Sequence, residues 1–351
     1  MLIPRRSFIT GAAAAIATPV RAWFPHGAPV VSPPSFTTSI IYHSSWDTNS
    51  AGGGGPGTGF TGTTFPGGYL NGAIASAGWN ATQWYNAVNA VFNQVITDLK
   101  ALVNSTGTVY AWAGFGIYPG SGSPFPNGTL ASNSPSPQTF SFSQAKTYLI
   151  NMQTAHPDSI KTSAYGASGA SLPATDTSGA VTWMAAQNWI NLLTNGSTYP
   201  GANTNPVGWS NSVTWDYTVN GSTCQAGYYS LYGMIQHELS FIIIGRPQPA
   251  VGFPNPFDMF AYSAANTIDY TYTDVGRYYS VDRGTTILAY GNGAGTPSSA
   301  DDFNRNSTPT YLGPYIDPIN TGRPSALTQI DGKYFALFLP LSSAGKTLAG
   351  I

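Results

Sequence analysis

The sequence has few charged residues and almost no cysteine. Only 8% of its 351 residues are charged, against about 25% in an average soluble domain. Thirteen lysines and arginines nearly balance fourteen acidic residues, so the formal net charge is -1 and we expect no basic surface for nucleic acid. Cys224 is the single cysteine, which excludes an internal disulfide and leaves stability to the hydrophobic core.

Long hydrophobic runs are also absent, which excludes a comfortable membrane-spanning helix of about 20 residues. The N-terminal segment "PRRSFITGAAAAIATPVRA" has paired Arg5 and Arg6 before a short apolar stretch of small residues. It resembles a twin-arginine export signal, with a small-residue cleavage site after Ala22. We therefore expect 1–22 to be a signal peptide and the protein to be exported to the periplasm, the cell surface or the extracellular space. The alternative for this segment is an ordinary N-terminal helix.

Apolar spacing in the rest of the chain predicts both helices and strands. One stripe recurs at intervals of three and four residues, as on one face of a helix: Trp84, Val88, Val91, Val95, Leu99 and Leu102. Ser141 and Gln144 have the spacing of a helix capping box. We expect strands at 36–47, 106–118 and 212–218, helices at 81–103, from 141 onwards, at 179–193 and at 228–245, and a hairpin at 277–290.

This order of elements predicts one α+β domain. A proline-rich lead-in at 23–35 precedes it, and the domain itself should cover 36–351. We expect a helix-and-sheet part at 36–246, in which the first two strands join a mixed sheet that packs on the first and last predicted helices. The remainder, 247–351, is rich in Pro, Gly and Tyr, and there we expect irregular loops and hairpins.

The last predicted helix contains His-Glu-Leu-Ser-Phe, one residue away from the zinc signature His-Glu-x-x-His. Positions i and i+4 share a helical face, so two histidines there can hold one zinc ion while the glutamate acts as general base. His237 and Glu238 are present, but Phe241 stands at i+4 and cannot bind metal. Taken alone, the pair has a simpler default explanation, a partly buried polar pair in a tyrosine-rich helix.

Other segments raise the weight of this motif. "HELSFIIIGR" is similar to a helix reading His-Glu-Ile-Ser-Glu-Val-Met-Gly-Arg, and "SLPATDTSGAVTWMAAQNW" (171–189) to a Ser-Leu-Pro-x-x-Asp segment with its following helix. "FDMFAYSA" (257–264) is similar to Asp-Leu-Phe-x-Tyr-Ser, and "YYSVDRGTTILAYGN" (278–292) to Tyr-Phe-Ser-Ile-Asp-Gly-Gly-x-Thr. In this order, over most of 36–305, the chain resembles a family of secreted bacterial zincin-like metalloproteases. The resemblance implies a zincin-like fold, with zinc on His237 and Glu238 as catalytic base.

The chain departs from that family at the site itself. The acidic residue that the family carries at i+4 aligns with Phe241. Gly245 stands one residue further along the chain than the glycine of the family's helix. One added residue rotates the rest of a helix by about 100°. Burial of Glu238 among apolar residues would be costly unless His237 or a backbone donor pairs with it, so we expect the two to persist as a hydrogen-bonded structural pair.

Other side chains offer limited compensation for the missing ligand. His26 lies in the leader region, His43 on a predicted strand, and His156 in a turn where a surface histidine is ordinary. Asp258 aligns with the acidic residue of the family's Asp-x-Phe motif and is the better candidate for a metal ligand. Its alternative role is that of a turn or capping residue after "FPNP". His237 and Asp258 alone would give zinc two protein ligands, where catalytic sites usually have three.

Three functions are consistent with these observations. The first is an exported zincin-fold protein with a degraded site, a catalytically impaired relative of metallopeptidases. The second is an active zinc metallopeptidase with non-standard ligands. The third is a surface or matrix protein that adheres to a protein or glycan, or self-assembles, through its Tyr-, Asn- and Gly-rich exterior. Metal content separates the second from the others, and fibre formation or glycan binding would favour the third.

Overall fold

The computed structural model describes residues 39–43, 68–70, 73–75, 81–115, 130–133, 137–180, 182–199, 206–210, 213–219, 227–244, 254–270, 277–290 and 327–351. The predicted signal peptide, the proline-rich lead-in, His26 and Cys224 lie outside these residues. Helices and strands both occur among the described residues, so the α+β class expected from the sequence is confirmed.

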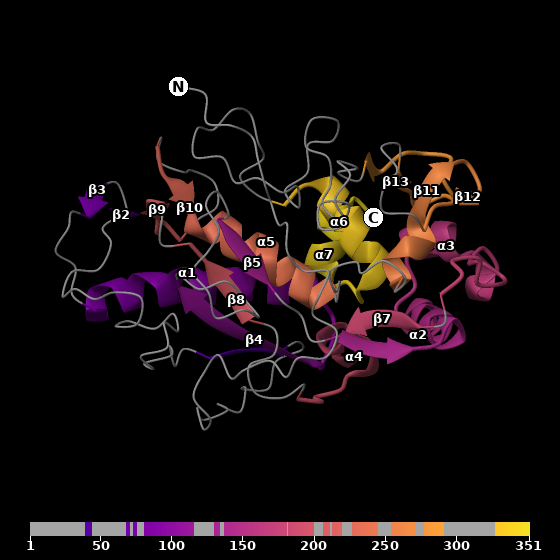
Figure 1. Cartoon of the computed structure of the whole chain (residues 1–351), viewed down its shortest axis with the longest axis horizontal. Coiled ribbons are helices and arrows are strands. Elements are labelled where there is room, and N and C mark those ends of the chain that lie inside the picture. The colour runs from indigo at the N-terminus through magenta and orange to yellow at the C-terminus, as the bar shows by residue number, and fades with distance from the viewer. Residues whose placement is uncertain are drawn as a thin grey trace.

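A four-stranded mixed sheet lies beside the helix of the apolar stripe and the helix of the His-Glu motif (Figure 1). Its strands in spatial order are β1 (Ser39–His43), β4 (Thr108–Phe115), β8 (Pro206–Trp209) and β5 (Ala131–Asn133). The first three run parallel, whereas β5 is antiparallel to β8 and forms an edge of the sheet. The prediction that 36–47 and 106–118 contribute strands to a mixed sheet is confirmed.

Helices α1 (Ala81–Leu102) and α5 (Leu231–Ile244) pack on this sheet and on each other. The predicted stripe is the buried face of α1: five of its residues have no exposed surface and Leu102 is half-buried, the five being Trp84, Val88, Val91, Val95 and Leu99. Complete burial of one such side chain contributes about 1.5–3 kcal/mol. α5 lies within the helix predicted over 228–245, but the predicted helix begins too early, because Tyr229–Ser230 form strand β10.

The helix predicted over 179–193 is wrong in its first half. Trp183–Ala186 forms a strand, β7, which pairs antiparallel with β6 (Pro137–Phe140). Helix α4 (Gln187–Thr194) follows, and Asn195 ends it in the left-handed conformation expected from the Asn-Gly pair. A short apolar run fits a buried strand as well as a helix, and here the pairing with β6 determines the outcome.

Side-chain amides of α4 complete the edge of β4 where β8 does not reach. β8 pairs with β4 from Trp112 onwards. Before that point, Asn188 accepts a hydrogen bond from the Tyr110 backbone N–H and donates one to its carbonyl, both at 2.9 Å. Asn191 donates to the Thr108 carbonyl at 2.8 Å. These bonds fix α4 to the sheet and satisfy buried backbone groups that would otherwise be costly.

Two further helices follow strand β6. α2 (Phe142–Ala155) begins with the predicted capping box, in which the Ser141 backbone N–H donates to the Gln144 side chain at 2.8 Å. α3 (Ser159–Tyr165) starts at Asp158, whose carboxylate accepts from the backbone of the third helical residue, and a short 3-10 helix, η1 (Ala167–Gly169), follows. These elements lie at the end of the molecule away from α1 (Figure 1).

The described residues after 253 contain more regular structure than the sequence predicts. They form η2 (Pro256–Phe260), β11 (Ala261–Ala264), β12 (Thr267–Ile268), β13 (Tyr278–Tyr279), β14 (Ala289–Tyr290), α6 (Gln329–Phe338) and α7 (Ser343–Ala349). The strands make one sheet in the order β12-β11-β13-β14, so the hairpin predicted at 277–290 is confirmed. Arg283 and Gly284 form its turn with positive φ angles of 62° and 81°. The two helices were not expected.

A second small sheet lies near the start of α5. It has the order β10-β9-β2-β3, from β10 (Tyr229–Ser230), β9 (Trp215–Asp216), β2 (Gly68–Leu70) and β3 (Ala73–Ala75).

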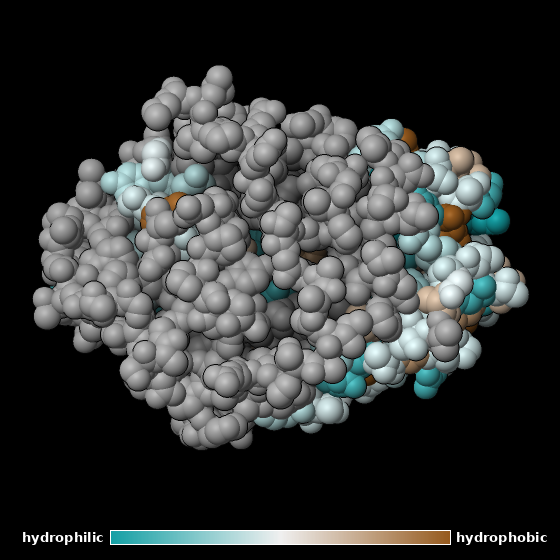
Figure 2. Space-filling view, in the orientation of Figure 1, coloured by the Kyte–Doolittle hydropathy of each residue, from teal (hydrophilic) through white to brown (hydrophobic). Residues whose placement is uncertain are grey.

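At the opposite end of the molecule, formed by α2, α3 and β11, Figure 2 shows mainly hydrophilic and neutral residues with small hydrophobic patches. Within the described ranges, no helix combines the length and hydropathy that a membrane crossing requires.

Candidate functional site

The candidate site lies on α5, a helix that is buried on almost every side. Its sequence is mostly apolar, and the sheet, α1 and α4 surround it. Between 231 and 243, His237 is the one side chain that is only half-buried. Within residues 231–243, the histidine of the motif is therefore the most solvent-accessible position, while its neighbours along the helix are enclosed.

Phe241 occupies the position that a second zinc ligand would need. Its ring stands edge-to-face on the His237 ring, with centroids 4.8 Å apart and planes inclined by 79°. Only 8% of Phe241 is exposed. The two side chains share a helical face, as residues four apart must, so an apolar ring fills the space beside the histidine.

Glu238 is 6% exposed and receives a hydrogen bond from a residue far away in the sequence. The Asn133 side chain, at the end of β5, donates through Nδ2 to Glu238 Oε2 at 2.5 Å. Burial raises the pKa of Glu238 from its usual 4.5 to about 7, while the hydrogen bond from Asn133 acts in the opposite direction. A carboxyl group with a pKa near 7 can exchange a proton at neutral pH.

The expected pairing of Glu238 with His237 or a backbone donor needs correction, because the observed partner of the carboxylate is Asn133. Adjacent residues on a helix point about 100° apart, so Glu238 turns toward the sheet edge while His237 turns toward Phe241. Little in the local sequence indicates this partner, since no strand is predicted at 131–133.

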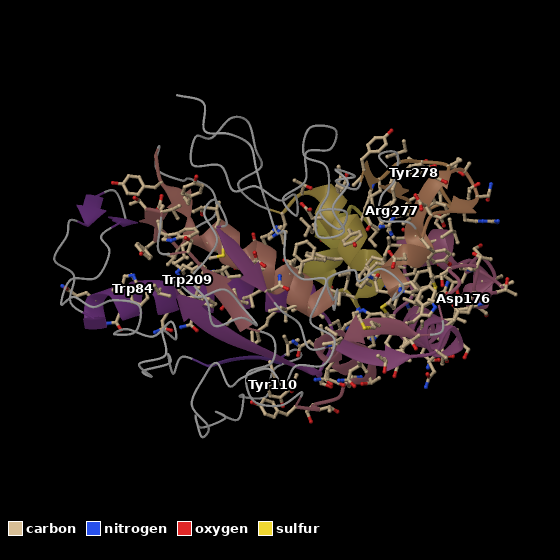
Figure 3. All side chains as sticks on the ribbon, viewed as in Figure 1. Trp84, Tyr110, Asp176, Trp209, Arg277 and Tyr278 are labelled. Atoms are coloured by element: carbon tan, nitrogen blue, oxygen red, sulfur yellow. The ribbon has the colours of Figure 1, made fainter. Side chains whose placement is uncertain are left out.

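Asp258 has the capping role that the sequence offered as its alternative. On η2, its Oδ2 accepts from the backbone N–H of Asn255 at 2.8 Å, which completes a capping box. Its Oδ1 forms a fully buried ion pair with Arg277, which precedes strand β13. Both carboxylate oxygens are therefore engaged. Figure 3 shows Arg277 beside Tyr278, toward the opposite end of the molecule from Trp84.

The other histidines take structural positions. His43 ends strand β1, where its backbone pairs with Trp112. His156 ends helix α2 and is half-buried. Burial lowers the pKa of His156, and the positive charges of Lys161 and Lys346 lower it further. His156 is therefore held mainly neutral at physiological pH, in a setting created by α3 and α7.

A polar network fixes α5 against α1 next to the motif. Tyr232 donates to a carboxylate oxygen of Asp98, whose other oxygen accepts from Gln94 at 2.9 Å. Gln236, beside His237, donates to the Tyr232 hydroxyl at 3.3 Å. Burial and the contact with Asp98 raise the pKa of Tyr232, so its hydroxyl remains a donor. The network thus joins α5 to α1 beside the motif.

The described residues do not fit a three-ligand zinc site. Phe241 blocks the i+4 position, the oxygens of Asp258 are engaged, and the described part of the chain contains no group of three or more His, Cys, Asp or Glu residues that could hold a metal. Comparison of the chain with protein-family models, with curated proteins and with solved structures gives no match.

Proposed function

We propose that the chain is an exported protein of zincin-like architecture whose peptidase centre is impaired. The export proposal rests on the paired arginines and the short apolar run of the leader. The architectural proposal is supported by a mixed sheet packed against α1 and α5, with the His-Glu pair on α5. The impairment follows from the residue at position 241.

The contact between Phe241 and His237 carries this proposal. A catalytic zinc ion usually has three protein ligands and an open position for water. At 4.8 Å between centroids, the phenylalanine ring occupies the volume beside His237 in which a ligand and its metal would sit. Without a metal-bound water, Glu238 has no activated nucleophile to deprotonate.

Zinc content and casein cleavage test the proposal on the exported protein, purified without chelators from the periplasm or medium. Its N-terminus should begin at Trp23, directly after the predicted cleavage site. We expect native protein and the matched apolar variant Phe241→Leu to hold no stoichiometric zinc and to leave casein intact. Phe241→His and Phe241→Glu restore a ligand at i+4, and we expect zinc binding to rise in at least one of them.

Stoichiometric zinc in the native protein, with casein cleavage that Glu238→Gln abolishes, would refute the impairment. It would establish instead the second candidate, an active metallopeptidase with non-standard ligands. One observation favours that candidate: the pKa of Glu238 is raised by burial to about 7, the range suited to a general base at neutral pH. Asp258→Asn separates the candidates further, because it should remove zinc only if Asp258 leaves its ion pair to become a ligand.

A further inference from the structure

Asn133 occupies a defined place at the edge of the main sheet. It is the last residue of β5 and lies opposite Val207 of β8, which is fully buried. Side chains alternate between the two faces of a strand, so Asn133 shares a face with Ala131, which is 3% exposed. Because β5 packs against α5, this face presents the Asn133 amide to the helix.

Glu238 reaches that amide from the helix side, and it is the only glutamate in the chain. Every other acidic residue is an aspartate, so the longer carboxylate side chain occurs once, at a buried position that bridges α5 and β5. On the same helix, Ile235, Leu239 and Ile242 have no exposed surface. Asn133 therefore supplies a polar contact to a carboxylate that apolar helix neighbours cannot solvate.

We propose that Asn133 is a positioning residue, which holds the Glu238 carboxylate against the edge strand of the sheet. The inference deepens the proposed function, because it assigns a partner to the glutamate that the impaired site retains. It requires no metal, since the hydrogen bond from Nδ2 to Oε2 joins two residues of the chain. A purely structural role would differ: Asn133 would then tie β5 to α5 without determining where the carboxylate lies.

Because the chain has a single glutamate, the environment of its carboxylate can be measured directly by NMR. Protein labelled with ¹³C at the glutamate δ carbon gives one side-chain carboxylate signal, which reports on Glu238 alone. We expect Asn133→Ala to shift and broaden this signal, because the carboxylate loses its fixed donor. Asn133→Gln keeps an amide donor and should restore a sharp signal near the native position. Asn133→Asp places a second carboxylate at the contact and should displace the signal further than Asn133→Ala.

The control is Asn191→Ala, which removes a different side-chain amide that ties a helix to the sheet. It should lower the thermal unfolding temperature while leaving the Glu238 signal in place. If Asn133→Ala lowers that temperature but moves the signal no more than Asn191→Ala does, Asn133 is only a structural tie and the proposal is overturned.

If Asn133→Ala does not fold, the proposal is tested by NMR on native protein instead. Magnetisation transfer across the hydrogen bond, from an asparagine side-chain amide to the labelled carboxylate, must then be seen, and its absence overturns the proposal. The measurement is made on zinc-free protein. Native zinc binding and casein cleavage would thus remove the proposed impairment while leaving the test of Asn133 intact.

Discussion

At the scale of the single residue, Glu238 is a carboxyl group in surroundings that disfavour its charged form. Its folded pKa is about 7 against a usual 4.5. Between these values the unfolded chain has lost its proton while the folded protein keeps it, so the free energy of unfolding falls as pH rises from 4.5 to 7. The difference of 2.5 units corresponds to a loss of about 3 kcal/mol that is complete above pH 7.

Glu238→Gln should remove this pH dependence, because glutamine is neutral and still accepts a hydrogen bond from Asn133. Relative to native protein, the variant should gain little near pH 4.5 and up to about 3 kcal/mol at pH 8. Urea unfolding at both pH values measures the difference. A constant difference between the two proteins across this range would contradict the raised pKa.

Asp282 offers a control of opposite sign. Burial alone would raise its pKa, but hydrogen bonds from Thr286 and Ser280 outweigh that effect and lower it. Its stabilising effect is present above the unfolded pKa and is lost as pH falls through the folded pKa. Asp282→Asn should therefore be less stable than native protein at neutral pH, and the difference should shrink in acid.

Contacts of the site between residues close in sequence could be predicted, whereas the contact between residues far apart in sequence could not. The His-Glu pair and the blocking Phe241 lie within one helical turn, so their shared face follows from helix geometry alone. Asn133 lies 105 residues before Glu238, on a three-residue strand within a Ser- and Pro-rich segment. No periodicity is readable over three residues, so only the folded chain reveals this contact.

At the scale of the elements, long apolar stripes were predictable and short runs were not. α1 has a continuous stripe over more than four turns, and no other structure would bury it as well. Trp183–Ala186 is apolar in every position, and its partner strand β6 determines that it is extended. α6 begins with a capping box at Thr328 and Asp331, a local signal that the sequence did carry.

The ion pair between Asp258 and Arg277 joins η2 to the start of β13, and both partners are buried. Removal of one partner leaves the other charge uncompensated in the interior, which costs about 3–5 kcal/mol. We expect Arg277→Met to lose about that much free energy of unfolding. Asp258→Asn should lose at least as much: asparagine still accepts from the Asn255 backbone N–H, but the buried Arg277 guanidinium keeps its charge and loses the carboxylate.

The double variant distinguishes pairing from packing. If the ion pair couples the two residues, Asp258→Asn with Arg277→Met together should cost less than the sum of the single variants. Urea unfolding of all four proteins at pH 7 gives this coupling. Strict additivity would show that the two side chains stabilise their elements independently.

At the scale of the whole molecule, the C-terminal helices close back on the first helix. The Asn104 backbone N–H donates to the Pro340 carbonyl at 2.7 Å, and the Ser342 N–H donates to the Leu102 carbonyl at 3.0 Å. Val103 and Leu341 form an isolated antiparallel bridge between these segments. The end of α1 is thus completed by residues more than 230 positions later, a contact that no local pattern predicts.

Gly345 of α7 tests how tightly this closure is packed. A β-carbon at this position would lie 2.2 Å from the Leu102 backbone carbonyl oxygen, which the surrounding hydrogen bonds hold in place. Alanine favours a helix over glycine by about 1 kcal/mol, but overpacking against fixed backbone costs about 1–3 kcal/mol or more. We therefore expect Gly345→Ala to be destabilising in urea unfolding, whereas Ser343→Ala, exposed on the same helix, should change little. Native stability in Gly345→Ala would mean that α7 can separate from the end of α1 without loss, and that the closure does not stabilise the molecule.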